Sequence, residues 1–262
     1  MKKTLTILLL TAIAAVSVLA AGCQKSAEKK KFTVGFDAEY PPYGYMAEDG
    51  TYTGFDLELA EALCKIEGWE LVKTPIDWGT KDQTLNAGEI DVIWNGFTMD
   101  GRENDYEFSN PYVDNSQVIV VAKDSGITDL AGLAGKKVGV QQGSAALELL
   151  QDEEGRKELA DTFSELAQFA DYNTAFQELM AGALDALAID VGVAEYQIEN
   201  RGNDKYVILE EELSKEQYAV GAKKGNTSLI ATINKDLKKL YDDGTVQKLA
   251  EKYGIADMII AQ

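Results

Sequence analysis

Residues 137–151 read KVGVQQGSAALELLQ and contain a strand pattern, a turn and a helix pattern in immediate succession. Residues 137–140 form a short apolar run that predicts a buried strand, and 145–151 have the apolar spacing of a helix. Between them Gly143 marks a turn and is followed by Ser144, a residue type that caps helix N-termini. The stretch therefore predicts a strand that leads directly into a helix, as in layered α/β proteins.

The same alternation continues along the chain from residue 32 onward. Short apolar runs predict strands over 32–36, 70–73, 92–95, 117–122, 137–140, 186–189 and 218–222. Helical spacing predicts helices over 56–67, 81–87, 145–151, 174–181, 193–199, 228–242 and 246–253. Strands that alternate with helices indicate an α/β fold with largely parallel sheets.

The composition excludes several classes of function. The chain has 262 residues, 45% of them hydrophobic and 26% charged, which is typical of a globular protein of one or two domains. It has 25 Lys and Arg against 44 Asp and Glu, and a formal charge of −19 makes nucleic acid a poor partner. The absence of histidine excludes Ser-His-Asp and Cys-His catalytic sites and histidine-ligated metals. We find no dinucleotide fingerprint or calcium loop, and we expect no cofactor and no metal.

The first 22 residues predict a secretory signal peptide. Two lysines precede an apolar run over 5–21, and small residues stand before Cys23. The sequence AAGC at 20–23 resembles the lipobox of bacterial lipoproteins, although Ala20 stands where that pattern prefers leucine. We therefore expect a lipid on Cys23, a polar tether over 23–31 and a location on the outer face of the cytoplasmic membrane. The alternative is an ordinary signal peptide followed by an incidental cysteine.

Polar residues follow the predicted strands, at the edge where open α/β sheets bind ligands. Arg102 can hold a carboxylate with its planar guanidinium, and Asp190 can accept hydrogen bonds from an ammonium group. Aromatic side chains suited to enclosing an apolar stem are Tyr40, Tyr43 and Trp78. One cation, one anion and an aromatic wall fit a zwitterionic amino acid.

Each of these residues also has an ordinary interpretation. Arg102 beside acidic residues is typical of a surface ion pair, and Ser144 is typical of a helix cap. Asp37, directly after a strand, often does no more than accept hydrogen bonds from turn amides. The individual residues therefore leave both interpretations open.

Longer motifs resemble the extracytoplasmic solute-binding proteins of family 3, which deliver polar amino acids to ABC importers. The matching stretches occur in the family's order over about residues 32–254. They are GFDLELA (54–60), DVIWNGFT (91–98), FSNPY (108–112), LAGKKVGVQQGS (133–144), and DGT (243–245) with KYG (252–254).

This resemblance implies a two-lobed periplasmic-binding-protein-like fold of type II. Lobe 1 would comprise 32–111 and 219–262, and lobe 2 would comprise 117–213. Two hinge crossings would lie at 112–116 and 214–218.

The resemblance also implies the ligand contacts. Arg102 and Thr98 would hold the α-carboxylate, helped by backbone around Ser144 and Ala145. Asp190 would bind the α-ammonium group together with Thr98 and the Gly96 carbonyl. The side-chain end would be lined by Asp37, Tyr40, Trp78 and Gln141. Thr98 and Arg102 are four residues apart, one fewer than is usual in the family, with Gly101 in the shorter loop.

The implied function is a lipid-anchored component of an ABC importer that closes on a polar amino acid and delivers it to a permease and its ATPase. We expect a monomer and no enzymatic activity. We expect an uncharged or cationic ligand rather than glutamate, because Asp37 would repel a second carboxylate. The alternative is a secreted enzyme resembling cyclohexadienyl dehydratase on the same scaffold, with Glu39 or Asp37 as general acid.

Overall fold

The computed structural model describes residues 29–202 and 204–262, and Lys31–Gln262 forms one compact unit. The predicted signal peptide, Cys23 and most of the predicted tether lie outside the described residues. Lys31, taken as the last tether residue, is the first residue of a strand. Across the described part of the chain, no helix has both the length and the apolar character needed to cross a membrane.

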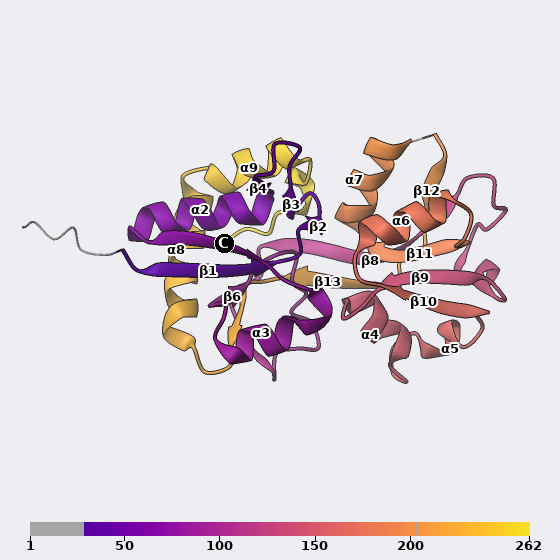
Figure 1. The fold of residues 1–262 in the computed structure, drawn as a ribbon, viewed down its shortest axis with the longest axis horizontal. Helices are drawn as coiled ribbons and strands as arrows, with labels where there is room; N and C mark the ends of the chain where they lie inside the picture. The colour runs from indigo at the N-terminus through magenta and orange to yellow at the C-terminus, as the bar shows by residue number, and fades with distance from the viewer. Residues whose placement is uncertain (1–28, 203) are drawn as a thin grey trace, which may run out of the picture. The chain divides into compact units, whose positions relative to one another are not determined.

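Two sheets form the centres of two lobes (Figure 1). We call lobe 1 the elements around the first sheet, whose strand order is β5-β1-β6-β14-β7. Helices α2, α8 and α9 cover one face of this sheet, and α3 lies against the other. The strands are β1 (Lys31–Phe36), β5 (Glu70–Pro75), β6 (Val92–Ile93), β7 (Tyr106–Phe108) and β14 (Gly221–Lys223), and the helices are α2 (Phe55–Glu67), α3 (Lys81–Ala87), α8 (Thr227–Asp242) and α9 (Thr245–Tyr253).

Lobe 2 surrounds the second sheet, whose order is β10-β9-β11-β8-β12, with β13 paired to β8. Helices α6 and α7 lie on one side of it and α4 and α5 on the other (Figure 1). The strands are β8 (Val113–Ala122), β9 (Lys137–Gln141), β10 (Glu165–Phe169), β11 (Ala186–Asp190), β12 (Tyr206–Ile208) and β13 (Ser214–Tyr218), and the helices are α4 (Ala145–Gln151), α5 (Lys157–Ala160), α6 (Tyr172–Met180) and α7 (Val191–Arg201).

Short elements complete the two lobes. A small antiparallel sheet precedes α2, and three 3₁₀ helices stand in connecting segments. They are β2 (Glu39–Tyr40), β3 (Gly44–Met46), β4 (Tyr52–Thr53), η1 (Trp78–Thr80), η2 (Leu130–Leu133) and η3 (Ala256–Met258).

The α/β class is as predicted, but both sheets are mixed. In lobe 1, β1 pairs in parallel with β5 and β6, whereas β14 pairs antiparallel with β6 and β7. In lobe 2, β9 pairs in parallel with β10 and β11, whereas β8 pairs antiparallel with β11, β12 and β13. The expectation of largely parallel sheets is thus wrong for the strands next to the crossings, because β8 and β13 pass between the lobes in opposite directions.

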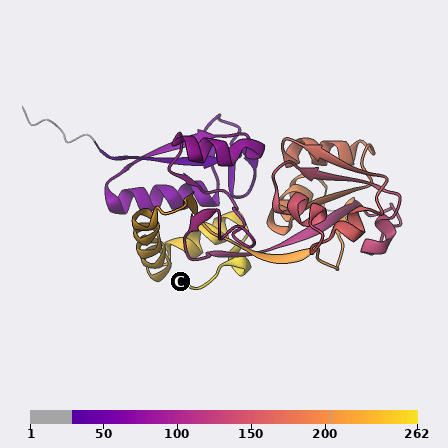
Figure 2. The same ribbon diagram turned by 90° about the horizontal axis from the view of Figure 1, so that it is seen from below.

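The two crossing strands run side by side between the lobes (Figure 2). Their register places Glu216 opposite Asn115 and Tyr218 opposite Val113. The run predicted as one strand over 218–222 is divided, because Tyr218 pairs within the lobe 2 sheet and Gly221 pairs with Ile93 and Phe108 in lobe 1.

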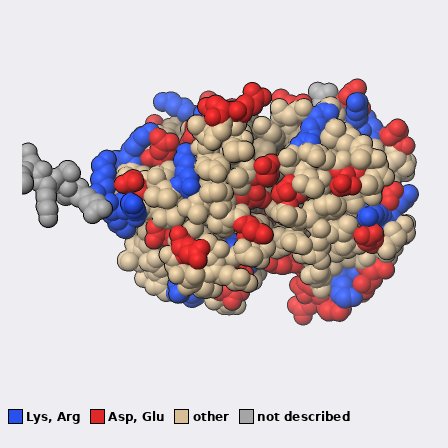
Figure 3. All heavy atoms as spheres, viewed as in Figure 1, with Lys and Arg blue, Asp and Glu red and all other residues tan. Residues whose placement is uncertain are grey.

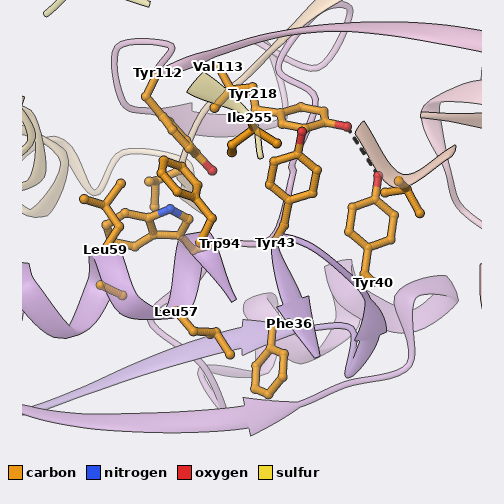
Figure 4. Packing of buried hydrophobic residues seen from close by; sticks show 14 of the residues in the cluster. Phe36, Tyr40, Tyr43, Leu57, Leu59, Trp94, Tyr112, Val113, Tyr218 and Ile255 are labelled. Atoms are coloured by element: carbon orange, nitrogen blue, oxygen red, sulfur yellow. Dashed lines mark hydrogen bonds between the residues drawn. The ribbon is translucent and has the colours of Figure 1, made fainter. Parts of the chain in front are cut away.

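A buried carboxylate fixes the start of α2 next to the edge of the lobe 1 sheet. Asp56 is fully buried and accepts hydrogen bonds from the Gly96 backbone N–H at 2.6 Å and the Tyr112 hydroxyl at 2.8 Å. Tyr112 packs with Trp94 in the same apolar cluster (Figure 4). Burial raises the pKa of Asp56 to about 7. The contact with Gly96 joins the lobe core to the loop that carries Thr98.

Replacing Asp56 with alanine is expected to destabilise the protein by about 2–5 kcal/mol, because two buried donors lose their acceptor. Urea unfolding of the wild type and the variant measures this loss. The exposed Asp124→Ala is a matched control and should change the stability by less than about 0.5 kcal/mol. A similar small change in the Asp56 variant would contradict the assigned role.

Candidate functional site

The ten residues predicted to bind ligand lie at the facing edges of the two lobes. Lobe 1 contributes Asp37, Tyr40, Trp78, Gly96, Thr98 and Arg102, and lobe 2 contributes Gln141, Ser144, Ala145 and Asp190. All are buried except Ala145, which is half-buried. A cavity of ≈ 390 Å³ between the lobes is lined by Thr98 of lobe 1 and by Ala145 of lobe 2.

Arg102 lies at the outer end of this interface and contacts both lobes. Its Nε donates to Glu148 Oε2 at 3.0 Å, and its Nη2 lies 2.9 Å from Glu148 Oε1. Its Nη1 donates to the Thr98 carbonyl at 3.2 Å, and its guanidinium lies 5.2 Å from the Phe97 ring centroid. Nη2 has no aligned hydrogen bond, so the guanidinium keeps N–H groups for a second carboxylate.

Asp190 ends β11 and lies at the crossing strands. Its Oδ1 accepts from Gln117 Nε2 at 2.6 Å, Tyr218 OH at 2.7 Å and Asn115 Nδ2 at 2.9 Å. A second carboxylate, Glu216, accepts from the same two amide nitrogens at 2.7 and 2.8 Å. Asp190 and Glu216 are therefore neighbours in a buried polar cluster.

Thr98 connects the arginine to this carboxylate cluster. Its hydroxyl donates to Glu216 Oε1 at 2.9 Å, while its carbonyl accepts from Arg102. A guanidinium and a carboxylate pair thus lie on either side of a single residue. This spacing suits a ligand that has an anionic and a cationic group on one carbon atom.

Aromatic rings and one further carboxylate form the other end of the interface. The Tyr40 and Trp78 rings are nearly parallel, at 11°, with their centroids 6.4 Å apart. Asp37 accepts from Gln141 Nε2 at 2.6 Å across the two lobes. Burial raises the pKa of Asp37 to about 6. Tyr172, which the sequence analysis missed, lies 6.0 Å from Tyr40 between ring centroids.

The structure shows specific contacts for two further predicted residues. Tyr43 is fully buried, its hydroxyl donates to Met258 Sδ at 3.8 Å, and its ring lies against Gly192 of lobe 2, where an added Cβ would come within 2.5 Å of the hydroxyl. The Ser144 hydroxyl caps α4, since it accepts from Leu147 N–H at 3.1 Å and donates to the Gln141 carbonyl at 2.8 Å. The Ser144 side chain is therefore a helix cap, as its ordinary interpretation predicts. The predicted ligand contact at this position would be made by the backbone.

Gly96 requires the absence of a side chain. Its φ is 55°, and a Cβ atom there would lie 2.8 Å from the Tyr40 ring and 3.1 Å from the Tyr218 ring. The hydroxyls of these two tyrosines face each other at 3.4 Å (Figure 4). Gly96 thus lets the strand end approach both rings closely.

The charges at the interface are mostly negative. Asp37, Glu148, Asp190 and Glu216 are acidic, and their basic neighbours are Arg102 and the buried Lys81, which donates to the Gly143 carbonyl at 2.9 Å. Burial and the charge of Arg102 lower the pKa of Lys81. Acidic groups also gather on the surface at the boundary of the lobes (Figure 3). Among the described residues, no cluster of three or more acidic or cysteine side chains is arranged to hold a metal ion.

Sequence reasoning missed the residues supplied by the crossing strands, namely Asn115, Gln117, Glu216 and Tyr218. In the structure Val113, Asn115 and Gln117 alternate with more exposed residues in β8, but residues 114–117 are all polar, so the sequence has no apolar alternation there. Glu216 and Tyr218 alternate in the same way in β13. Nothing in the sequence distinguishes Glu148 from the other acidic residues expected on solvent-exposed helix faces.

Comparisons with known proteins identify similar sequences and structures. Residues 32–256 match the family described as bacterial extracellular solute-binding proteins, family 3. The L-cystine-binding protein TcyJ of Escherichia coli (strain K12) is 32% identical over 238 residues, 89% of this chain and 86% of that protein.

Two solved structures are similar to the whole fold. An ABC uptake transporter substrate-binding protein from Streptococcus pneumoniae with bound histidine has a TM-score of 0.81 and 36% identity, covering 85% of this chain and 92% of that chain. An ancestral amino-acid-binding protein, a precursor of cyclohexadienyl dehydratase, has a TM-score of 0.77 and 31% identity, covering 85% and 95%.

Proposed function

Because the chain belongs to the bacterial extracellular solute-binding proteins of family 3, we propose that it is the amino-acid-binding component of an ABC importer. The observation that carries this proposal is the buried arrangement around Thr98, with Arg102 on one side and the Asp190–Glu216 pair on the other. Opposite charges at this spacing match the carboxylate and ammonium groups of an α-amino acid. The similar proteins named for cystine and solved with histidine support an amino-acid ligand.

The residues would divide the ligand between them as follows. Arg102 binds the α-carboxylate, with Thr98 and the backbone around Ser144 and Ala145. Asp190 binds the α-ammonium group with Thr98 and the Gly96 carbonyl. Asp37, Tyr40, Trp78 and Gln141 enclose the side chain.

In this structure the two lobes already contact each other at the site, as in a closed state. Lobe 1 (32–111 and 219–262) and lobe 2 (117–213) would rotate about the crossings at 112–116 and 214–218. A ligand that contacts Arg102 and Asp190 at once contacts both lobes, so it favours the closed state by its greater affinity for that state. Asp37 and Gln141 are already hydrogen-bonded across the lobes in this structure, at 2.6 Å, so opening of the lobes would break this contact.

The negative charges at the interface favour a ligand that is neutral or cationic. We expect L-glutamine to bind more tightly than L-glutamate, and L-arginine more tightly than L-citrulline, by about tenfold or more in each pair. Isothermal titration at pH 7.5, where Asp37 is mostly ionised, measures both ratios. Asp37→Asn should reduce both affinity ratios, whereas the exposed Asp124→Asn should leave them unchanged. Tighter binding of glutamate than of glutamine would overturn the assigned role of Asp37.

The N-terminal sequence supports a membrane anchor for this component. A lipid on Cys23 would hold the protein at the outer face of the cytoplasmic membrane, next to the permease and ATPase that it serves. Labelling with radioactive palmitate tests this directly, because Cys23→Ser should abolish the label. Label retained in that variant would contradict the anchor.

We propose a binding protein without enzymatic activity, although one similar structure is a dehydratase precursor. Arg102 and Asp190 are placed to bind the two charged groups of an amino acid. Asp37, a general-acid candidate in the alternative enzyme, accepts a hydrogen bond from the Gln141 amide. A prephenate turnover assay distinguishes the two functions.

A further inference from the structure

Two carboxylates share their hydrogen-bond donors where the strands cross between the lobes. Asp190 and Glu216 are buried, with 3% and 6% of their surfaces exposed. The Asn115 amide donates to Asp190 at 2.9 Å and to Glu216 at 2.7 Å. The Gln117 amide donates to Asp190 at 2.6 Å and to Glu216 at 2.8 Å. Because each amide nitrogen contacts both carboxylates, the two acids lie within a few ångströms of each other.

Within the described residues, the side chains that donate hydrogen bonds to this pair are all neutral. Besides the two amides they are the hydroxyls of Thr98, at 2.9 Å from Glu216, and Tyr218, at 2.7 Å from Asp190. Arg102 is separated from the pair by Thr98 and is already paired with Glu148. Two buried like charges without a cation are unfavourable, so the pair requires either a proton or a cation.

The other charged groups near Glu216 do not supply that cation. In its own strand, Lys215 has 84% of its side chain exposed and pairs with Glu212. Asp100, from the loop after β6, and Asp114 of β8 line a cavity of ≈ 530 Å³ that Glu216 also borders, and both add negative charge. Asp56 lies behind Gly96, in the lobe 1 core. Burial, followed by the charge of Asp190, raises the pKa of Glu216 to about 8. In the ligand-free protein Glu216 therefore holds a proton at neutral pH.

Two buried acceptors in the same cluster point toward a donor-rich ligand group. The side-chain oxygens of Asn115 and Gln117 are buried and accept no hydrogen bond from the described residues. An ammonium group carries three N–H donors and a positive charge. It would satisfy both carboxylates and still have a donor for one of these oxygens.

We propose that Glu216 is a second binding residue for the ligand's α-ammonium group and that it releases its proton to solvent when this group binds. The inference rests on the proposed function, in which Asp190 receives the same group. The proton is transferred from the Glu216 carboxyl to water or buffer, and the resulting carboxylate pairs with the ammonium. Glu216 borders two cavities, of ≈ 530 and ≈ 390 Å³, which give the proton a route out.

Proton release makes the affinity depend on pH with a definite sign. Below about pH 8 the ligand-free protein holds one proton more than the complex, so the affinity rises as the pH rises. Between pH 6.5 and 7.5 the gain approaches tenfold per pH unit, and it levels off above pH 8. Asp37, with a pKa of about 6, contributes mainly below pH 7. The absence of histidine removes the usual background of proton exchange near neutrality.

The test counts the protons released on binding. The chain from residue 24 onward is titrated with L-arginine at pH 7.0 in phosphate and in Tris, two buffers that differ in ionisation enthalpy. If L-arginine gives no heat of binding, the titration is repeated with L-histidine and, if that also gives none, with L-glutamine. We expect about 0.9 proton released per ligand at pH 7.0 and about 0.5 at pH 8.0.

Glu216→Gln should bring the release at pH 7.0 close to zero and flatten the dependence of affinity on pH. The exposed Glu211→Gln is the matched control and should release as many protons as the wild type. Binding without proton release in the wild type, or unchanged release in Glu216→Gln, overturns the inference and leaves the proposed function standing. Failure of all three amino acids to bind overturns the proposed function itself, and the inference with it. If Glu216→Gln does not fold, the wild-type proton count decides the question.

Discussion

Replacing Asp190 with asparagine is expected to weaken amino-acid binding by at least about 100-fold, with the fold retained. The substitution keeps the size of the side chain and an acceptor for Tyr218, Asn115 and Gln117, but it removes the charge opposite the ammonium group. Breaking a buried charge pair in this way costs about 3–5 kcal/mol of binding free energy. Titration calorimetry measures the loss, and circular dichroism measures the fold.

Asp190→Ala should abolish binding as well. It also removes the repulsion between Asp190 and Glu216, so its cost to the free energy of unfolding is expected to stay below about 2 kcal/mol. Binding within threefold of the wild type in Asp190→Asn would contradict the assignment of the ammonium group to this residue.

Replacing Arg102 with alanine is expected to weaken binding by a similar factor, because it removes the guanidinium that we propose binds the ligand's carboxylate. Arg102→Lys keeps the charge but not the planar pair of donors, so we expect it to recover only part of the affinity. Direct titration with the amino acid compares the three proteins.

Glu148→Gln separates ligand contact from contact between the lobes. It breaks the ion pair to Arg102 but leaves the guanidinium in place, and the Glu148 side chain is 55% exposed. A surface pair of this kind is worth about 1 kcal/mol or less, so we expect a change in affinity of less than about tenfold. Normal binding in Arg102→Ala would contradict the assignment of the ligand's carboxylate to Arg102. It would mean that the loop from Thr98 to Arg102, which is one residue shorter than is usual in the family, does not bring Arg102 to the ligand.

Local patterns predicted the parts of the fold whose structure depends on neighbours in sequence. Helices α3 and α4 were predicted with their observed bounds, and Ser144 was predicted as the α4 cap. Ser144 caps the start of α4, and α3 ends at Gly88, which adopts the left-handed conformation that glycine favours. The α/β class followed from the same alternation.

The crossing strands were harder to predict, because their partners are distant in sequence. β13 begins Ser-Lys-Glu, and the first half of β8 is polar, so neither has the apolar run of a buried strand. They are strands because they pair with each other, about 100 residues apart, and bury Asn115 and Glu216 in one polar cluster. The antiparallel pairing of β14 has the same non-local origin.

Some residues of the candidate site could likewise be predicted from local sequence, whereas others depend on contacts between distant segments. Thr98 and Gln141 lie in family motifs and Asp190 follows a predicted strand, so all three could be proposed from the sequence, and they lie at one interface in the structure. Glu216 and Glu148 belong to no such motif, and their roles depend on which charges face them in space. Only the fold brings Glu148 to Arg102 and Glu216 to Asp190.

The most direct test of the central claim is thermal unfolding of residues 24–262 in the presence of each amino acid and of prephenate. A ligand at about 100 times its dissociation constant stabilises the folded state by about 2.7 kcal/mol, which raises the midpoint by several degrees. We predict such a shift with one or a few neutral or cationic amino acids, and its loss in Asp190→Asn. No shift with any amino acid, or a shift with prephenate accompanied by its turnover, would contradict the account.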